Sequence, residues 1–161
     1  ELIDCSLSAG ADGIYYAAMG AEFAYFTSEE FEEFIAPIER EILNYIKSKT
    51  NFHILHICKS GIDLARYRDY HPQVVNWAVH EENPGLLEGA KFFPDSILFG
   101  GFDDRAGVLV DGTEDQIIRE THRLLTQMEN RPFILGADCT LPTEISYQRI
   151  HNVVKAVESY R

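Results

Sequence analysis

One histidine and two cysteines are the residues in this chain whose types and spacing best suggest chemistry. His56 and Cys58 lie at the end of a short apolar run, residues 52–60 (FHILHICKS), and Cys139 ends the last apolar run before the C-terminal helix. Residues two apart in a β-strand point to the same side, so His56 and Cys58 would present an imidazole and a thiol together. Zinc in catalytic sites accepts two cysteines and one histidine and leaves a fourth position open. The pattern therefore indicates a zinc site that activates a bound thiol, and the alternative is three buried side chains without a metal.

The composition is that of a globular domain with an acidic surface. The chain has 161 residues, of which 45% are hydrophobic, enough for one domain with a sizeable core. Its net charge of -12 disfavours binding to nucleic acid or to an anionic membrane, because both partners would be negative. No long apolar run and no signal-peptide pattern is present. We therefore expect a cytoplasmic protein without nucleic-acid or membrane partners.

Cysteine usage argues against disulfides. Three cysteines at wide spacing, Cys5, Cys58 and Cys139, make a poor disulfide framework. Metal binding or thiol chemistry remains as the functional option for Cys58 and Cys139. For Cys5 we expect the ordinary role of a small buried apolar side chain, because free cysteine is among the most buried residue types.

Short apolar runs alternate with segments of helical periodicity along the whole chain. The runs predict strands over residues 13–19, 52–58, 74–79, 96–101 and 132–136. Helices are expected over residues 27–49, 62–67, 83–91, 113–128 and 146–160. The last helix is expected to bury Ile150, Val153, Val154 and Val157. Residues 102–112 are expected to form a loop.

Local signals mark where two of these helices begin. Thr27 with Glu30, and Thr113 with Gln116, have the spacing of capping boxes. Pro37 lies inside the first long helix and should bend or divide it, because proline lacks the N–H that the helix needs.

Strands that are apolar throughout and alternate with helices predict a parallel sheet covered by helices, so the fold class is α/β. Two topologies remain open. The chain could form a flavodoxin-like open sheet, or it could be the later part of an eight-stranded (β/α)8 TIM barrel. In both, the functional face lies beyond the C-terminal ends of the strands, which is where His56, Cys58 and Cys139 would converge.

Other polar residues would lie on the same face. His80 could bind substrate as an acid or base, or could be the solvated start of a helix. Asp103 and Asp104 could bind substrate or cap the loop that follows them. Glu22 could complete a metal shell, whereas His53 should be structural, since its odd separation from His56 places it on the other strand face.

Longer segments resemble the uroporphyrinogen decarboxylase superfamily. They are, in chain order, SAGADGIYYAAMG, TSEEFEEFIAPIEREIL, HILHICKSG, ILFGGFDDRAGVLVDGTEDQI and FILGADCTLPTEISYQRIHNVVKAV. Members of this superfamily are (β/α)8 barrels of roughly twice this length. The resemblance implies that residues 1–161 form the C-terminal half of such a domain, about five βα units, without the first three strands.

The resemblance also separates two chemistries. The decarboxylases carry a Gly-His-Gly type of turn after the last strand, whereas residues 136–139 here read GADC. The cobalamin-dependent methyltransferases hold zinc with a His-x-Cys after a middle strand and a Cys after the last strand, and His56, Cys58 and Cys139 match these positions. Lys59 departs from the pattern, because a glycine is common there.

The methyltransferase branch implies a specific activity. A methyl group would pass from a methylated corrinoid, carried by a separate protein, to a small thiol acceptor bound at zinc. The alternatives are a uroporphyrinogen decarboxylase of porphyrin biosynthesis and a corrinoid- or metal-binding module without catalysis. Because half a barrel exposes two sheet edges, we also expect it to pair with a second copy or with the missing N-terminal half.

Overall fold

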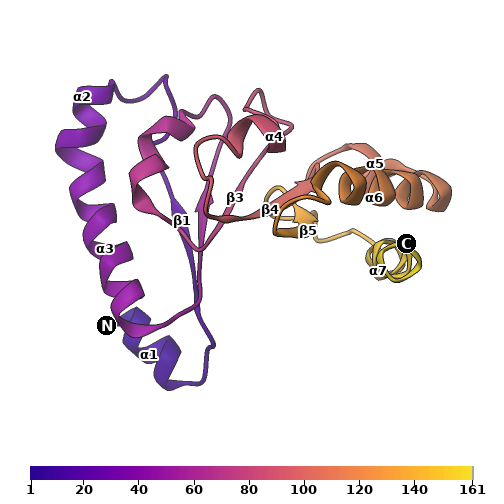
Figure 1. The fold of residues 1–161 in the computed structure, drawn as a ribbon, viewed down its shortest axis with the longest axis horizontal. Coiled ribbons are helices and arrows are strands. Elements are labelled where there is room, and N and C mark those ends of the chain that lie inside the picture. The colour runs from indigo at the N-terminus through magenta and orange to yellow at the C-terminus, as the bar shows by residue number, and fades with distance from the viewer. Residues whose placement is uncertain (161) are drawn as a thin grey trace.

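Five parallel strands form one sheet whose spatial order follows the chain order, as shown by a computed structural model that describes residues 1–160 (Figure 1). Each strand pairs with the next one in the sequence. Every crossover therefore steps in the same direction around the sheet, as in a barrel, whereas a flavodoxin-like sheet reverses its order. The α/β class and the partial barrel are confirmed, and the flavodoxin-like alternative is wrong. The strands are β1 (Ile14–Ala18), β2 (His53–Ile57), β3 (Val74–Trp77), β4 (Ile97–Phe102) and β5 (Phe133–Ala137).

The helices follow the expected alternation. The capping boxes are present: Thr27 and Glu30 bond to each other at the start of α2, and Thr113 and Gln116 do so at the start of α6. The helical elements are α1 (Leu2–Ser8), α2 (Ser28–Glu30), the π-helix η1 (Phe31–Ile35), α3 (Ala36–Lys49), the 3-10 helix η2 (Leu64–Tyr70), α4 (Leu86–Gly89), α5 (Gly107–Asp111), α6 (Glu114–Met128) and α7 (Tyr147–Ser159). No helix within residues 1–160 has both the length and the apolar character needed to cross a lipid bilayer.

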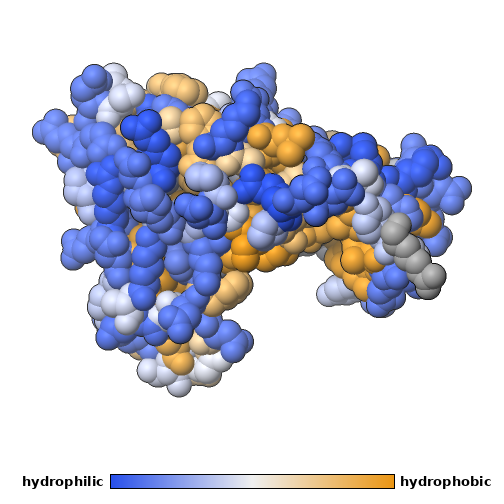
Figure 2. Space-filling view, viewed as in Figure 1, coloured by the Kyte–Doolittle hydropathy of each residue, from blue (hydrophilic) through white to orange (hydrophobic). Residues whose placement is uncertain are grey.

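The hydrophobic core lies between one face of the sheet and the helices. Leu55, Ile57, Val75, Trp77 and Leu98 point to that face and are fully buried. The opposite face is less covered: Tyr15 is 51% exposed and Ile134 is 37% exposed. Figure 2 shows the molecule hollowed between α1 and α7, and hydrophobic residues gather in this hollow. The sheet is thus a curved wall with helices outside and an open inner face.

Pro37 divides the first long helix, as predicted. Five residues of π-helix separate α2 from α3, and Pro37 lies in the first turn of α3. A proline is tolerated there, because the first N–H groups of a helix have no intrahelical partner. The missing donor of Pro37 therefore falls at a helix start.

The helix expected over residues 83–91 is much shorter than predicted. It is only α4, because hydrogen bonds from side chains hold the preceding residues in a loop. The Asn83 Nδ2 group donates to the carbonyls of Lys59 (3.0 Å) and Ala78 (2.7 Å). The indole N–H of Trp77 donates to the Pro84 carbonyl at 2.7 Å.

The C-terminal part of the chain differs from the predictions at two places. The expected loop over residues 102–112 contains α5, which buries Leu109 and whose carbonyls accept hydrogen bonds from Arg149 of α7. In α7 the prediction is wrong for Val154 and Val157, which are 49% and 41% exposed, whereas Ile150 and Val153 are partly buried. Asn152 and Ala156 are the fully buried residues of this helix, and Val153 packs against the core beside them.

Cys5 is exposed on α1, so the expectation that it is buried is wrong. The seven residues of α1 bury none of their side chains, because this short helix lies at the margin of the structure (Figure 1). Exposure makes Cys5 a useful internal control for the two other cysteines.

Candidate metal centre

The structure brings together the three ligands predicted from the sequence. Each of His56, Cys58 and Cys139 offers one potential ligand atom, and these three atoms lie within 4.8 Å of one another. The His56 Nε2 atom is 3.4 Å from the Cys139 Sγ atom. Zinc bonds of typical length at a tetrahedral angle place nitrogen and sulfur about 3.6 Å apart. The cluster therefore has donor types and spacing that fit a metal ion such as zinc.

The sheet positions these side chains at its C-terminal edge. His56 belongs to β2, and the strand ladder continues to Cys58, whose N–H donates to the Ala18 carbonyl at 3.2 Å. After β5, the Asp138 N–H donates to the Phe102 carbonyl at 2.8 Å and extends the β4–β5 ladder to the residue before Cys139. Backbone pairing thus fixes all three positions.

The environment sets the protonation of the cluster. Burial lowers the pKa of His56, although its hydrogen bond with Asn76 opposes this, and a neutral imidazole is the form that binds metal. Burial, and then the neighbouring Cys139, raises the pKa of Cys58. Two adjacent thiols resist joint ionisation, and a divalent cation between them would reverse that preference. The cluster is suited to a cation.

Two further residues complete the site and were missed in the sequence. The Tyr15 ring stacks on the His56 imidazole, with ring centroids 5.6 Å apart, and its hydroxyl donates to Asn76 Oδ1 at 3.1 Å. Burial, and then the two cysteines, raises the pKa of Tyr15 to about 12. Asn76 was detectable as the only polar residue within an apolar strand, VVNW. Tyr15 had no comparable signal.

His80 lies against the residue that precedes Cys139. Its Nδ1 atom is 2.8 Å from Asp138 Oδ2, and this hydrogen bond raises the pKa of His80. The Asp138 carboxylate is 1% exposed and also accepts from the Gly101 N–H at 3.0 Å. His80 also borders a small cavity beside α6, of about 170 Å³, together with Arg123. Substrate binding by His80 stays a prediction.

Asp103 and Asp104 lie in the loop after β4. Asp103 Oδ1 accepts from the backbone N–H groups of Arg105 (2.8 Å) and Ala106 (3.0 Å), which is loop capping. Asp104 is 1% exposed, and its Oδ2 atom lies 3.0 Å from the Arg105 Nε atom. Burial raises the pKa of Asp104. Their predicted role in substrate binding is not tested by these contacts.

Glu22 and His53 lie apart from the cluster. The Glu22 carboxylate accepts from the Gly20 N–H at 3.1 Å and is not among the clustered ligand atoms, so the hypothesis that it completes the metal shell is not supported. His53 is on the helix-covered face, where its Nε2 atom accepts from the Gln73 N–H at 3.2 Å. The prediction that His53 points away from His56 is confirmed.

Lys59 has a left-handed backbone, with φ of 86°. Such a conformation favours glycine, because a Cβ atom crowds the following carbonyl. The hydrogen bond from Asn83 to the Lys59 carbonyl helps to hold this turn directly after Cys58.

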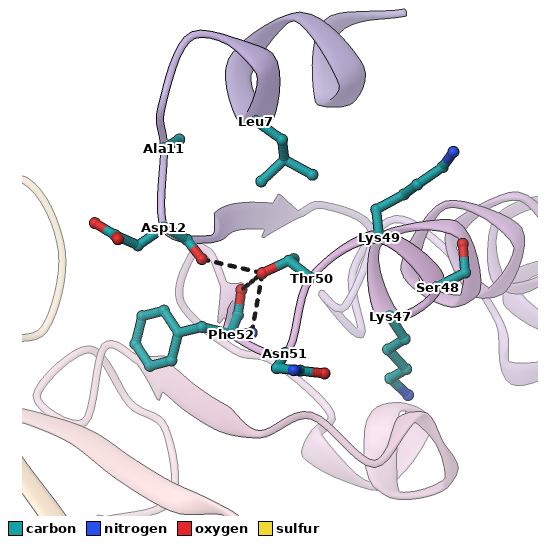
Figure 3. Close-up of a pocket in the computed structure, with 9 residues that line it drawn as sticks. All are labelled: Leu7, Ala11, Asp12, Lys47, Ser48, Lys49, Thr50, Asn51 and Phe52. Atoms are coloured by element: carbon teal, nitrogen blue, oxygen red, sulfur yellow. Dashed lines mark hydrogen bonds between the residues drawn. The ribbon is translucent and has the colours of Figure 1, made fainter.

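A cavity of about 570 Å³ lies at the other end of the sheet (Figure 3). Its lining comes from the segments that precede β1 and β2, and the Thr50 hydroxyl donates to the Asp12 carbonyl at 3.0 Å there. Of its two lysines, Lys47 donates to the Tyr70 carbonyl and Lys49 lies 3.7 Å from Asp4. This cavity lies at the N-terminal ends of the strands, away from the cluster.

Comparisons with known proteins agree with the fold. The family of uroporphyrinogen decarboxylase (URO-D) matches residues 1–160. The solved structure of a methyltransferase from Methanosarcina mazei is similar, with a TM-score of 0.74 at 21% sequence identity. The similarity covers 97% of this chain and 44% of that protein, so the chain spans less than half of its length. No significant similarity to a curated protein sequence was found.

Proposed function

The chain belongs to the uroporphyrinogen decarboxylase family, and within this family we propose that it supplies the metal centre of a zinc-dependent methyltransferase. The methyl donor would be a methylated corrinoid on a partner protein, and the acceptor would be a small thiol. One observation carries this proposal: the ligand atoms of His56, Cys58 and Cys139 converge within 4.8 Å at the C-terminal edge of the sheet. The similarity to a methyltransferase structure supports it.

The residues present fit zinc by their chemistry. Two thiolates and one neutral imidazole balance a divalent cation and match the soft donors that zinc prefers. Bound there, zinc would hold the acceptor as a thiolate, the nucleophile that methyl transfer requires. His56 is 3% exposed and is covered by the Tyr15 ring, so water reaches the imidazole poorly. The Tyr15 side chain is half-exposed and faces the open inner surface of the sheet, from which the methyl donor could approach.

The tetrapyrrole decarboxylase alternative is less favoured. Such an enzyme would bind the carboxylate side chains of its substrate with basic groups. Of the basic residues near this rim, Arg66 is bonded to backbone carbonyls of the loop after β1, Arg105 pairs with Asp104 and Arg123 pairs with Glu120, which leaves Lys59. A cluster of two thiols and an imidazole also has no role in a metal-free decarboxylation. A metal-binding module without catalysis would keep the cluster and differ only in turnover.

Methyl transfer from methylcobalamin to a small thiol tests the proposal. We expect turnover by the zinc-loaded full-length protein, loss after chelation, and loss in Cys139→Ser. Cys5→Ser is the matched control and should retain activity, since Cys5 is exposed on α1 outside the cluster. Decarboxylation of uroporphyrinogen by the metal-free protein, without methyl transfer by the zinc form, would contradict the proposal and support the decarboxylase.

A further inference from the structure

We propose that Asn76 is a positioning residue of this centre: it selects the tautomer of His56 and links this imidazole to the strand end that carries Cys139. The inference rests on the proposed function in that it treats His56 as a ligand. The network consists of Tyr15, His56, Asn76 and two backbone carbonyls, one from β4 and one from β5.

Asn76 is placed by strand register and is buried. It pairs with His56 across β2 and β3, so the two side chains project from the same face of the sheet. Asn76 is 1% exposed and is the only polar residue of β3. A buried amide is costly unless its donors and acceptor are all bonded. Its hydrogen bonds therefore define its orientation.

The backbone determines which way the amide points. Asn76 Nδ2 lies 2.8 Å from the Phe99 carbonyl oxygen and 3.4 Å from the Ala137 carbonyl oxygen. Carbonyl oxygens only accept, so the NH₂ group must face them, and the flipped amide would oppose oxygen to oxygen. Asn76 Oδ1 is consequently the atom that faces His56 and Tyr15.

The orientation of the amide in turn determines the histidine tautomer. Asn76 Oδ1 is 2.5 Å from His56 Nδ1 and can only accept, so Nδ1 carries the proton. His56 Nε2 is then the nitrogen with a free lone pair, and it is the atom that lies 3.4 Å from Cys139 Sγ. The Tyr15 hydroxyl donates to the same Oδ1 at 3.1 Å and fills its second lone pair. The imidazole is thus prepared to bind a metal through Nε2.

Asn76 also holds the backbone segment that leads to Cys139. The Ala137 carbonyl that it bonds is two residues before Cys139 in the chain. Gly100, with φ of 142°, leaves room for this contact, because a Cβ there would lie 3.3 Å from Asn76 Nδ2 and 3.4 Å from Asp138 Oδ1. One side chain of β3 therefore connects the ligand of β2 to the strand that precedes the ligand after β5.

The test is the His56 tautomer, read by ¹⁵N NMR of the full-length protein labelled at histidine. In the zinc-free wild type we expect protonated Nδ1 and unprotonated Nε2. In Asn76→Leu this preference should disappear, and zinc affinity, measured by chelator competition, should fall by about 10- to 100-fold. In Tyr15→Phe, which keeps both the ring and Asn76, the tautomer should be unchanged.

Two results would overturn the inference: a wild-type His56 protonated on Nε2, or an Asn76→Leu variant with wild-type zinc affinity. The wild-type spectrum needs no variant, so it decides the tautomer even if Asn76→Leu fails to fold. A wild-type protein that binds no zinc but shows protonated Nδ1 would contradict the proposed function and leave the tautomer assignment standing.

Discussion

The three clustered residues could be predicted from the sequence, but their contacts with Asn76 and Tyr15 could not. His56 and Cys58 are two apart at the end of an apolar run, and Cys139 follows another such run, which are local signals. The contact of Asn76 with His56 and Tyr15 depends on the register of three strands. Register is set by how the whole sheet packs, and a single strand does not encode it.

Lys59 offers a prediction at the residue scale. Its φ of 86° costs a non-glycine residue on the order of 1 kcal/mol. Lys59→Gly should therefore raise the free energy of unfolding by about 1 kcal/mol in urea denaturation. Lys59→Ala is the control and should bring no gain, because alanine also has a Cβ. A glycine variant less stable than the wild type would show that the lysine side chain compensates for the strain.

At the scale of elements, the predictions succeeded where local chemistry decides the structure. The capping boxes at Thr27 and Thr113 and the division at Pro37 depend on residues within one turn. The predictions failed for α4 and α5, whose limits depend on distant partners. Asn83 is held by Lys59 and Ala78, and the α5 carbonyls are bonded by an arginine of α7.

Helix α3 carries a buried carboxyl that should make stability depend on pH. Glu39 is 5% exposed, and burial raises its pKa from 4.5 to about 7, although the hydrogen bond from Tyr70 at 3.2 Å opposes the shift. The folded protein binds this proton more tightly than the unfolded chain. Its stabilising effect is therefore complete below about pH 4.5 and is lost as the pH rises through about 7.

Glu39→Gln should remove this dependence. Relative to the wild type, the variant should gain stability at pH 8, by about 3 kcal/mol as an upper value, and gain little at pH 4.5. Urea unfolding at both pH values measures the difference. Glu41→Gln, at an exposed position of the same helix, is the matched control and should show no such difference. Equal effects of the two substitutions would contradict the assignment to Glu39.

At the scale of the whole molecule, local patterns predicted the fold class, whereas the partial barrel was predicted only from the family resemblance. Continuous apolar runs give strands, and their alternation with helices gives a parallel sheet. Those patterns left the flavodoxin-like arrangement open, because strand order depends on which strands pair, and the sequential order now excludes it. The apolar pattern also misled for two residues of α7, because Val154 and Val157 are apolar and yet exposed.

Because the sheet has two unpaired edges and an uncovered inner face, we expect the chain to associate with another polypeptide. Within residues 1–160, β1 and β5 each pair on one side only, and the inner face exposes Tyr15 and Ile134. We predict that the 161-residue chain pairs with a second copy or with an N-terminal half barrel supplied separately. Sedimentation at micromolar concentration should show a dimer, or a complex with the added half. A chain that remains monomeric under both conditions would contradict this prediction.

Zinc content of the purified full-length protein tests the central claim most directly. The three converging ligands predict about one zinc per chain in the wild type and in Cys5→Ser, and a sharp loss in Cys139→Ser. Equal and negligible zinc in all three proteins would contradict the metal centre and, with it, the proposed methyltransferase.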